Sequence, residues 1–286
     1  LSLKIIINIL TAIVTFMVSP FLCLHNMPTI HFWPIFTTVK QFFCTINWQK
    51  NIGGSGNDVN LISTQNFQGD IFIAGNSNSN NQDIPGNQGG TDIYVAKLTD
   101  SGTQVWSKNF GGTLDDIAAS IASTTDGGLI ILCYTASSTN DFLQAGVWLL
   151  KLSSDGTEDF KTFYGANVGQ KGKVIQTSDG GYIFNSSKTE NASDFWVVKT
   201  NAAGAITWQN TYGGISNDYA VDILEYDNHY YLLGDSESTS VNGETNHGGF
   251  DILFLKIDLT GLVIWTKLFG GPSDDGGNRV VLDEVN

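Results

Sequence analysis

Aspartates at regular positions are the side chains of this sequence that could most directly bind a ligand. Four of them follow a tryptophan by ten residues: Asp58, Asp116, Asp218 and Asp275. Carboxylate oxygens suit Ca²⁺, and they would also attract a cationic ligand. Each repeat, however, offers one aspartate rather than the dense run of oxygens in a calcium loop. An aspartate that caps backbone N–H groups of its own turn is the simpler interpretation. We therefore predict neither a metal site nor a cofactor.

Further acidic residues lie in two long loops rich in Asn, Ser and Gly, residues 76–90 and 235–249. The binding candidates in these loops are Asp83, Asp235, Glu237 and Glu244. Loops that vary in length on a rigid scaffold are common places for binding sites. If each repeat is a four-stranded antiparallel sheet, these loops leave it on the same face as the turn with the repeated aspartate. The sequence therefore predicts one binding face for both sets of acids.

The composition weighs against most catalytic sites. A Ser-His-Asp triad would have to use His229 or His247, and the sequence has no Gly-x-Ser-x-Gly turn. A site for carboxylate substrates would need several arginines, whereas the chain has only Arg279. Two acids that face one pocket suffice for a glycosidase, so the 28 acidic residues leave that mechanism open. We interpret the chain as a non-enzymatic scaffold that binds a glycan, another polymer or a protein. The alternative is an extracellular polysaccharide hydrolase or lyase.

The repeated aspartates belong to a longer motif, Trp-x-x-x-aromatic-Gly-Gly-x-x-x-Asp. The first aromatic of each copy is Trp48, Trp106, Phe160, Trp208 or Trp265. The glycine pairs are Gly53–Gly54, Gly111–Gly112, Gly213–Gly214 and Gly270–Gly271. In the copy at Phe160, Ala166 and Gln170 replace the second glycine and the aspartate. A lysine precedes four of these aromatics by nine residues: Lys97, Lys151, Lys199 and Lys256. A fixed period of this kind indicates a repeat protein.

Each repeat contains four short β-like runs joined by Gly and Asp turns, and no helical periodicity follows residue 45. This pattern predicts an all-β fold, a β-propeller of four-stranded antiparallel blades. The repeats are residues 58–110, 116–164, 170–212 and 218–269, with a partial fifth from residue 275. An outer strand at residues 47–52 and an inner strand at residues 279–285 flank the complete blades. We interpret the repeated aromatic as the residue that packs one blade on the next, and Gly-Gly as a turn between blades. Four complete blades with partial ends leave the ring open, which predicts that the sequence is a fragment.

The charge balance limits the partners of this chain. The net charge is −14, and nucleic acid binding, which needs clustered Lys and Arg, is therefore not expected. Residues 1–24 place Lys4 before an apolar stretch, which is typical of an export signal and also long enough for a membrane anchor. Residues 25–45 form a linker before the propeller domain at residues 46–286. We expect membrane contact only through the N-terminal segment.

The combined motifs resemble the repeat of secreted bacterial β-propeller proteins. The resemblance rests on the Trp-Gly-Gly-Asp motif, on Asp179–Ile183 (Asp-Gly-Gly-Tyr-Ile) and on Asp194–Lys199 (Asp-Phe-Trp-Val-Val-Lys), and it covers residues 46–286. Proteins of this family are uncharacterised surface proteins that often end in a type IX secretion sorting domain. The resemblance implies an extracellular or cell-surface location, associated with the outer membrane, and an extracellular glycan or protein as ligand. It implies no catalytic residue, because the shared motif is structural. In a eukaryotic secretory pathway, Asn185 and Asn191 would also be glycosylation sites.

Overall fold

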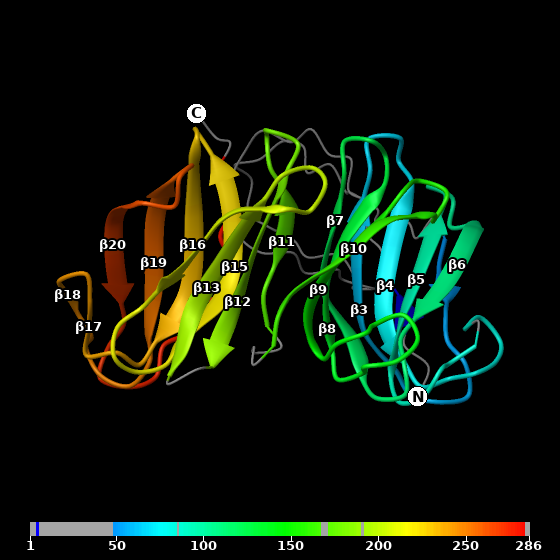
Figure 1. Cartoon of the computed structure of the whole chain (residues 1–286), viewed down its shortest axis with the longest axis horizontal. Coiled ribbons are helices and arrows are strands. Elements are labelled where there is room, and N and C mark those ends of the chain that lie inside the picture. Colours follow the sequence, from blue (N-terminus) through cyan, green and yellow to red (C-terminus); the bar gives the residue numbers. More distant parts are fainter. Residues whose placement is uncertain (1–3, 6–47, 85, 167–170, 190–191, 284–286) are drawn as a thin grey trace, which may run out of the picture.

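The computed structural model describes residues 4–5, 48–84, 86–166, 171–189 and 192–283. These residues form four antiparallel sheets of four strands each, which stand side by side in sequence order (Figure 1). The chain is therefore an all-β propeller with four-stranded blades, as the sequence predicts. We number the blades 1 to 4 along the sequence. The described residues include no helix long and apolar enough to span a lipid bilayer.

In each blade, every strand pairs with the next strand of that blade along the chain. Blade 1 consists of β3 (Asp58–Gln65), β4 (Ile71–Ser77), β5 (Asp92–Leu98) and β6 (Gln104–Phe110). Blade 2 consists of β7 (Asp116–Ser123), β8 (Leu129–Thr135), β9 (Gly146–Leu152) and β10 (Glu158–Gly165). Blade 3 consists of β11 (Val174–Gln176), β12 (Tyr182–Thr189), β13 (Ser193–Thr200) and β14 (Ile206–Tyr212). Blade 4 consists of β15 (Asp218–Tyr226), β16 (His229–Ser236), β19 (Asp251–Asp258) and β20 (Val263–Phe269).

Two short strand pairs lie outside these sheets. They are β1 (Lys4–Ile5) with β2 (Lys50–Asn51), and β17 (Ser240–Val241) with β18 (Glu244–Thr245). Antiparallel pairing sends the connections of a blade to two opposite faces. The loop face carries the connections from second to third strand and the Gly-Gly turns between blades. The hairpin face carries the turns from first to second and from third to fourth strand.

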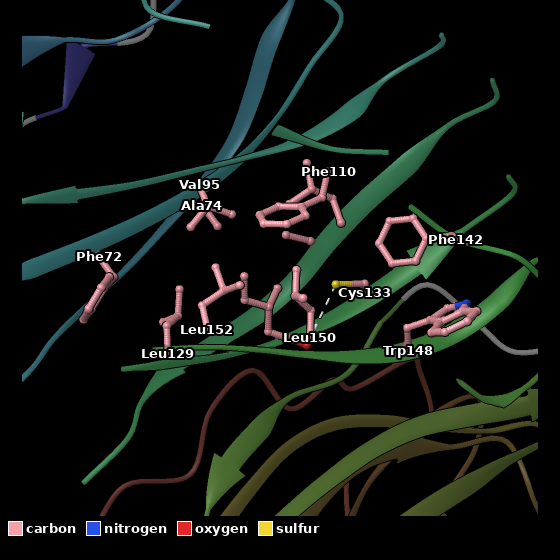
Figure 2. Packing of buried hydrophobic residues seen from close by; sticks show 13 residues of the cluster. Phe72, Ala74, Val95, Phe110, Leu129, Cys133, Phe142, Trp148, Leu150 and Leu152 are labelled. Carbon is pink, nitrogen blue, oxygen red and sulfur yellow. Dashed lines mark hydrogen bonds between the residues drawn. The ribbon is translucent and has the colours of Figure 1, made fainter. Parts of the chain in front are cut away.

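The core lies between the blades, because each inner blade is covered on both sides. All residues of β4 and β8 are buried, which explains why each strand begins with a run of apolar residues rather than an alternating pattern. Between blades 1 and 2, Phe72 and Val95 pack in one cluster with Leu129 and Leu150 (Figure 2). Cys133 belongs to the same cluster as a buried free thiol, and burial raises its pKa.

The signature tryptophans join each blade to the next on the hairpin face. Trp106 Nε1 of blade 1 donates to the backbone oxygen of Ser154, in the third-to-fourth-strand turn of blade 2 (3.1 Å). Equivalent bonds run from Trp48 Nε1 to Asp100 O (2.8 Å) and from Trp208 Nε1 to Leu259 O (2.9 Å). A glycine with positive φ lies against each of these rings: Gly102, Gly156 and Gly261. The blade-packing interpretation of the repeated aromatic is therefore confirmed.

The degenerate copy keeps the same junction with different chemistry. Phe160 has no N–H group, but its ring still lies against Gly204 in the corresponding turn of blade 3. Tyr164 donates its hydroxyl to Gly204 O at 2.6 Å, and Tyr212 makes the equivalent bond to Gly261 O (2.7 Å) beside Trp208. The junction between blades 2 and 3 thus keeps the tyrosine bond and the ring packing, and it lacks the indole bond.

The expectation of an inner strand at residues 279–285 is wrong for its described part, which ends at residue 283. The backbone N–H of Gly277 donates to Asp235 Oδ1 (2.7 Å), and that of Val280 donates to Asp222 Oδ2 (2.8 Å). Carboxylates of blade 4 therefore take N–H groups around the start of the predicted strand. This explains why the segment follows blade 4 without joining a strand ladder.

The packing of Trp208 under its glycine gives a matched test of the blade junction. Gly261 and Gly180 both have positive φ (87° and 82°), so alanine at either position costs about 1–2 kcal/mol. A Cβ at Gly261 would lie 3.1 Å from the Trp208 ring and 2.4 Å from Asn210 Nδ2, whereas one at Gly180 meets nothing within 4 Å. We expect Gly261→Ala to lower the free energy of unfolding by roughly 1–3 kcal/mol more than Gly180→Ala in urea titrations. Equal losses would contradict the packing role.

Candidate functional site

The repeated aspartates hold the Gly-Gly turns on the loop face. Asp116 is fully buried, and its Oδ2 accepts the backbone N–H of Gly112 (2.7 Å) and the hydroxyl of Ser137 (2.7 Å). The Thr135 hydroxyl donates to the other carboxylate oxygen. The same cap joins Asp58 to Gly54 N (2.8 Å), Asp218 to Gly214 N (2.7 Å) and Asp275 to Gly271 N (2.7 Å). These carboxylates stabilise backbone turns.

These bonds bear out the capping interpretation of the repeated aspartates, whereas their place among the candidate binding residues needs correction. Asp116 and Asp218 are fully buried, and their turns and hydroxyls surround them, so a ligand on the loop face does not reach them. Asp58 is half-buried and bound in the same way. Asp58 borders a small pocket of about 20 Å³, and Asp275 lines a larger open cleft, which is described below.

Sequence reasoning missed the partners of these caps. The caps of Asp58 and Asp116 use two hydroxyl residues separated by one position at the end of the second strand: Ser77 and Ser79, and Thr135 and Ser137. In the cap of Asp218, Ser238 donates at 2.9 Å, and Ser236 stands at the other position. The second hydroxyl also accepts a turn N–H, as Ser137 Oγ does from Leu114 N (3.0 Å). A Cβ on Gly112 would lie 2.6 Å from the Ser137 Cβ, so this position must be glycine. The recurring Ser/Thr-x-Ser signal was present in the sequence.

A second layer of aspartates lies beside the first, at the start of the third strand of blades 1, 3 and 4. Asp92 is buried, and its Oδ2 accepts the backbone N–H of Gln88 at 2.6 Å. Its Oδ1 has no hydrogen-bond partner, and the same holds for one oxygen each of Asp194 and Asp251. Burial raises the pKa of Asp92 to about 6, and the charge of Asp116 adds to the effect. Burial and the charge of Asp218 likewise raise the pKa of Asp194.

The structure brings two of the predicted site residues together in one cleft, the loop-face cleft, of about 230 Å³. It is lined by Tyr219, Asp235, Phe250, Asp274, Asp275 and Gly276. The rings of Tyr219 and Phe250 lie with centroids 5.8 Å apart at an angle of 36°. The cleft therefore combines an aromatic wall with three carboxylates, at the end of β16 and in the turn that follows blade 4.

Backbone hydrogen bonds fix the cleft. The N–H of Asp275 donates to Phe250 O (2.6 Å), and the N–H of Phe250 donates to Asp274 Oδ1 (3.0 Å). Asp235 Oδ1 accepts the N–H of Gly277 (2.7 Å). Burial raises the pKa of Asp235, although this hydrogen bond acts to lower it. Tyr219, Phe250 and Asp274 were not singled out in the sequence. Phe250 directly precedes the Asp of the third-strand motif, which is the one signal that could have pointed to it.

The other predicted loop acids lie apart from this cleft. Asp83 belongs to blade 1, is exposed and accepts Gly53 N at 3.3 Å. Glu237 accepts from the Asn217 amide (2.8 Å), and Glu244 forms an ion pair with Lys267 (2.6 Å). Of the two expected sequons, Asn185 is fully buried and so is not open to glycosylation. Asn191 lies outside the described residues.

The repeated lysines occupy the hairpin face as ion-paired strand residues. The pairs are Lys97–Asp70, Lys151–Asp126 and Lys199–Asp179, each at 2.8 Å. Lys256 instead lies over the ring of Tyr231, 5.4 Å from its centroid. Among the described residues, no group of three or more His, Cys, Asp or Glu side chains is arranged to hold a metal ion.

Comparisons with known proteins give weak likenesses. Neither a family model nor a curated protein matches the chain. Among solved structures, it is similar to an α-L-arabinofuranosidase from Clostridium thermocellum (14% identity, 73% of this chain and 71% of that one, TM-score 0.39). It is also similar to a protein of unknown function from Dyadobacter fermentans (14%, 74% and 63%, TM-score 0.49) and to the hydrazine synthase of Kuenenia stuttgartiensis (10%, 70% and 64%, TM-score 0.44). No residue role in this chain rests on these likenesses.

The capping role of Asp116 can be separated from ligand binding by stability. Asp116→Ala leaves the Gly112 N–H and two hydroxyls without their buried acceptor, which should cost about 2–4 kcal/mol of unfolding free energy. Asp83→Ala removes an exposed carboxylate and should cost less than about 0.5 kcal/mol. Chemical denaturation of both variants checks the difference. A small loss for Asp116→Ala would restore it as a candidate ligand residue.

The raised pKa values predict that acid stabilises this protein. A carboxyl whose pKa is higher in the folded state than the ordinary 3.8 binds a proton more tightly in that state. Its contribution to the free energy of unfolding is therefore complete below pH 3.8. For Asp92 that contribution is lost as the pH rises through about 6 and amounts to at most about 3 kcal/mol. We expect the melting temperature to fall between pH 4.5 and 7.5. The fall should be smaller in Asp92→Asn, and an unchanged slope in that variant would contradict the assignment.

Proposed function

We propose that this chain is a β-propeller scaffold that binds carbohydrate in the loop-face cleft. The observation that carries the proposal is the pairing of two aromatic rings with three carboxylates in one small, open cleft. The C–H faces of a sugar ring pack on aromatic side chains, while carboxylates accept hydrogen bonds from its hydroxyl groups. This combination supports a glycan more than a peptide or an ion.

The charge of the site supports a neutral ligand. Asp235, Asp274 and Asp275 are the charged residues of the cleft lining, so phosphate, sulfate and carboxylate groups would be repelled. The net charge of −14 extends the same preference over the molecule. A neutral polysaccharide or glycoprotein glycan meets both conditions. It also agrees with the extracellular or cell-surface location that the family resemblance implies, which is part of this proposal.

The geometry of the acids supports binding rather than bond cleavage. One oxygen of each carboxylate is taken by a backbone N–H: that of Gly277 for Asp235, Phe250 for Asp274 and Gly271 for Asp275. Each acid therefore keeps a fixed orientation and offers its remaining oxygen to a ligand hydroxyl. Sites that are fixed before the ligand arrives lose little freedom on binding, which raises affinity.

A polysaccharide hydrolase is the second candidate, and one observation favours it. Burial raises the pKa of Asp235, which lies in the same cleft as Asp274 and Asp275. Two carboxyl groups that face one pocket, one of them with a raised pKa, are the usual acid and base of a glycosidase. In that case Asp235 would donate the proton to the leaving oxygen, and Asp274 or Asp275 would act as nucleophile or base.

A glycan array followed by calorimetry tests the main proposal with the full chain. Asp274→Asn and Phe250→Ala should each weaken binding of the best neutral glycan about tenfold or more, since each removes a direct contact. Glu237→Gln, in the same loop but outside the cleft, should bind like the original protein. Glycan binding that survives both cleft substitutions would contradict the proposal. Release of reducing ends from the same glycan, lost in Asp235→Asn, would instead establish the hydrolase.

A further inference from the structure

A second pocket opens on the opposite, hairpin face, between blades 3 and 4, with a volume of about 240 Å³. We call it the hairpin-face pocket. The residues that matter in its wall are Ser178, Asp179, Lys199, Trp208, Glu225 and Tyr230. Tyr230 and the Asp235 of the loop-face cleft lie five residues apart on β16, which is about 17 Å along a strand. The two openings therefore lie at opposite ends of the same strand.

The polar wall of this pocket is held in place by its own contacts. Lys199 is 3% exposed, and its Nζ donates to both oxygens of Asp179 (3.0 and 2.8 Å) and to Thr200 O (2.9 Å). Glu225 accepts from Ser178 through both oxygens, from the backbone N–H at 2.8 Å and from the hydroxyl at 2.6 Å. The carboxylates keep lone pairs for a further donor, and their orientation is set before a ligand arrives.

The aromatic part of the wall offers carbon surface and one free hydroxyl. The Trp208 N–H donates to Leu259 O, so the half-buried ring lines the pocket with its apolar atoms. The Tyr230 ring is buried, with its centroid 6.2 Å from that of Trp208. Within the part of the chain that the structure describes, the Tyr230 hydroxyl makes no hydrogen bond, although it belongs to the pocket wall. Burial raises the pKa of Tyr230, which keeps this hydroxyl a donor at neutral pH.

The charges of the wall exclude anions. Lys199 is neutralised by Asp179, and the charge that remains in the wall is the carboxylate of Glu225, so no free positive group faces a phosphate or sulfate. What the wall presents is therefore an apolar ring, fixed acceptors and hydroxyl donors in a space smaller than that of a drug-sized site. A pyranose has the matching parts, a C–H face and a rim of hydroxyl groups.

We infer that the hairpin-face pocket is a second carbohydrate site, which takes one neutral sugar residue between blades 3 and 4. The kind of ligand in this inference rests on the proposed function, whereas the location of the site rests on the hairpin-face pocket itself. With sites on two opposite faces, one molecule can join two glycan chains, and several such contacts raise the overall affinity for a polymer. The preceding junction differs, because Phe160 and Gln176 stand where this one has Trp208 and Glu225.

Tryptophan fluorescence of the full chain can report this pocket by itself, since the residues that line the loop-face cleft include no tryptophan. The probes are methyl glycosides of glucose, galactose, mannose, xylose and arabinose, each titrated separately. At least one should change the fluorescence of the original protein, and that change should disappear in Trp208→Phe. Tyr230→Phe and Glu225→Gln keep the side-chain volume and should weaken the effect about tenfold, while Asp274→Asn should leave it unchanged. Thermal unfolding of each variant confirms that it is folded.

The outcomes separate this inference from the proposed function. The hairpin-face site would be overturned if no probe changed the fluorescence. It would also be overturned if Tyr230→Phe and Glu225→Gln bound the probe as tightly as the original protein, even if the loop-face cleft binds glycan. On the glycan array, a loss of binding confined to these two variants, with Phe250→Ala and Asp274→Asn unaffected, would support the hairpin-face site and count against the cleft. If both sites bind, a neutral polysaccharide should cross-link the protein into aggregates that disperse when either site is substituted.

Discussion

The structure depends on how each Gly-Gly turn between blades satisfies its backbone N–H groups. In the cap of Asp116, one buried carboxylate and two hydroxyls do this work, and Gly111 and Gly112 leave no room for a side chain between them. Buried N–H groups without acceptors would cost several kcal/mol per turn, so these contacts are required for the fold. They also set where the loop face begins. The first residues of these loops, such as Ser79 and Ser238, belong to the caps. The remainder of each loop differs in length between blades.

The opposite face is held by different chemistry, the indole N–H that reaches the next hairpin. The junction between blades 2 and 3 departs from the others on both faces, because Phe160 replaces the tryptophan and Ala166 and Gln170 replace the second glycine and the aspartate. It keeps the bond from Tyr164 to Gly204 O, which Tyr212 also makes to Gly261 O beside Trp208, and blade 3 still packs against blade 2. Each junction is thus held by several contacts, and the loss of some of them leaves the blades packed.

Much of the architecture could be predicted from the sequence, because the spacing of the repeated motif residues determines how the blades pack. The period, the four strands, the capping Asp and the stacking Trp all follow from residues that contact near neighbours or the next repeat. The cleft could not be predicted in the same way. Tyr219 and Phe250 become partners only when β15 and the β16–β19 connection meet, and Asp274 differs from the buried aspartates only in its surroundings. The inner strand predicted at residues 279–285 failed for a similar reason, since carboxylates of blade 4 take N–H groups of that segment.

The two faces also differ in how their acids ionise, and this follows from where the lysines lie. On the hairpin face, burial alone would raise the pKa of Asp179, but the hydrogen bond from Lys199 is among the contacts that lower it to about 2. On the loop face no repeated lysine is present, and burial raises the pKa values of Asp92, Asp116 and Asp235. Mild acid therefore protonates these carboxyls at the loop end of the blades while Asp179 at the hairpin end stays charged. A ligand held by Asp235 must respond to pH between the ordinary and the raised pKa, whereas one held beside Asp179 and Lys199 need not. The same residue type thus serves two faces with separate electrostatic behaviour.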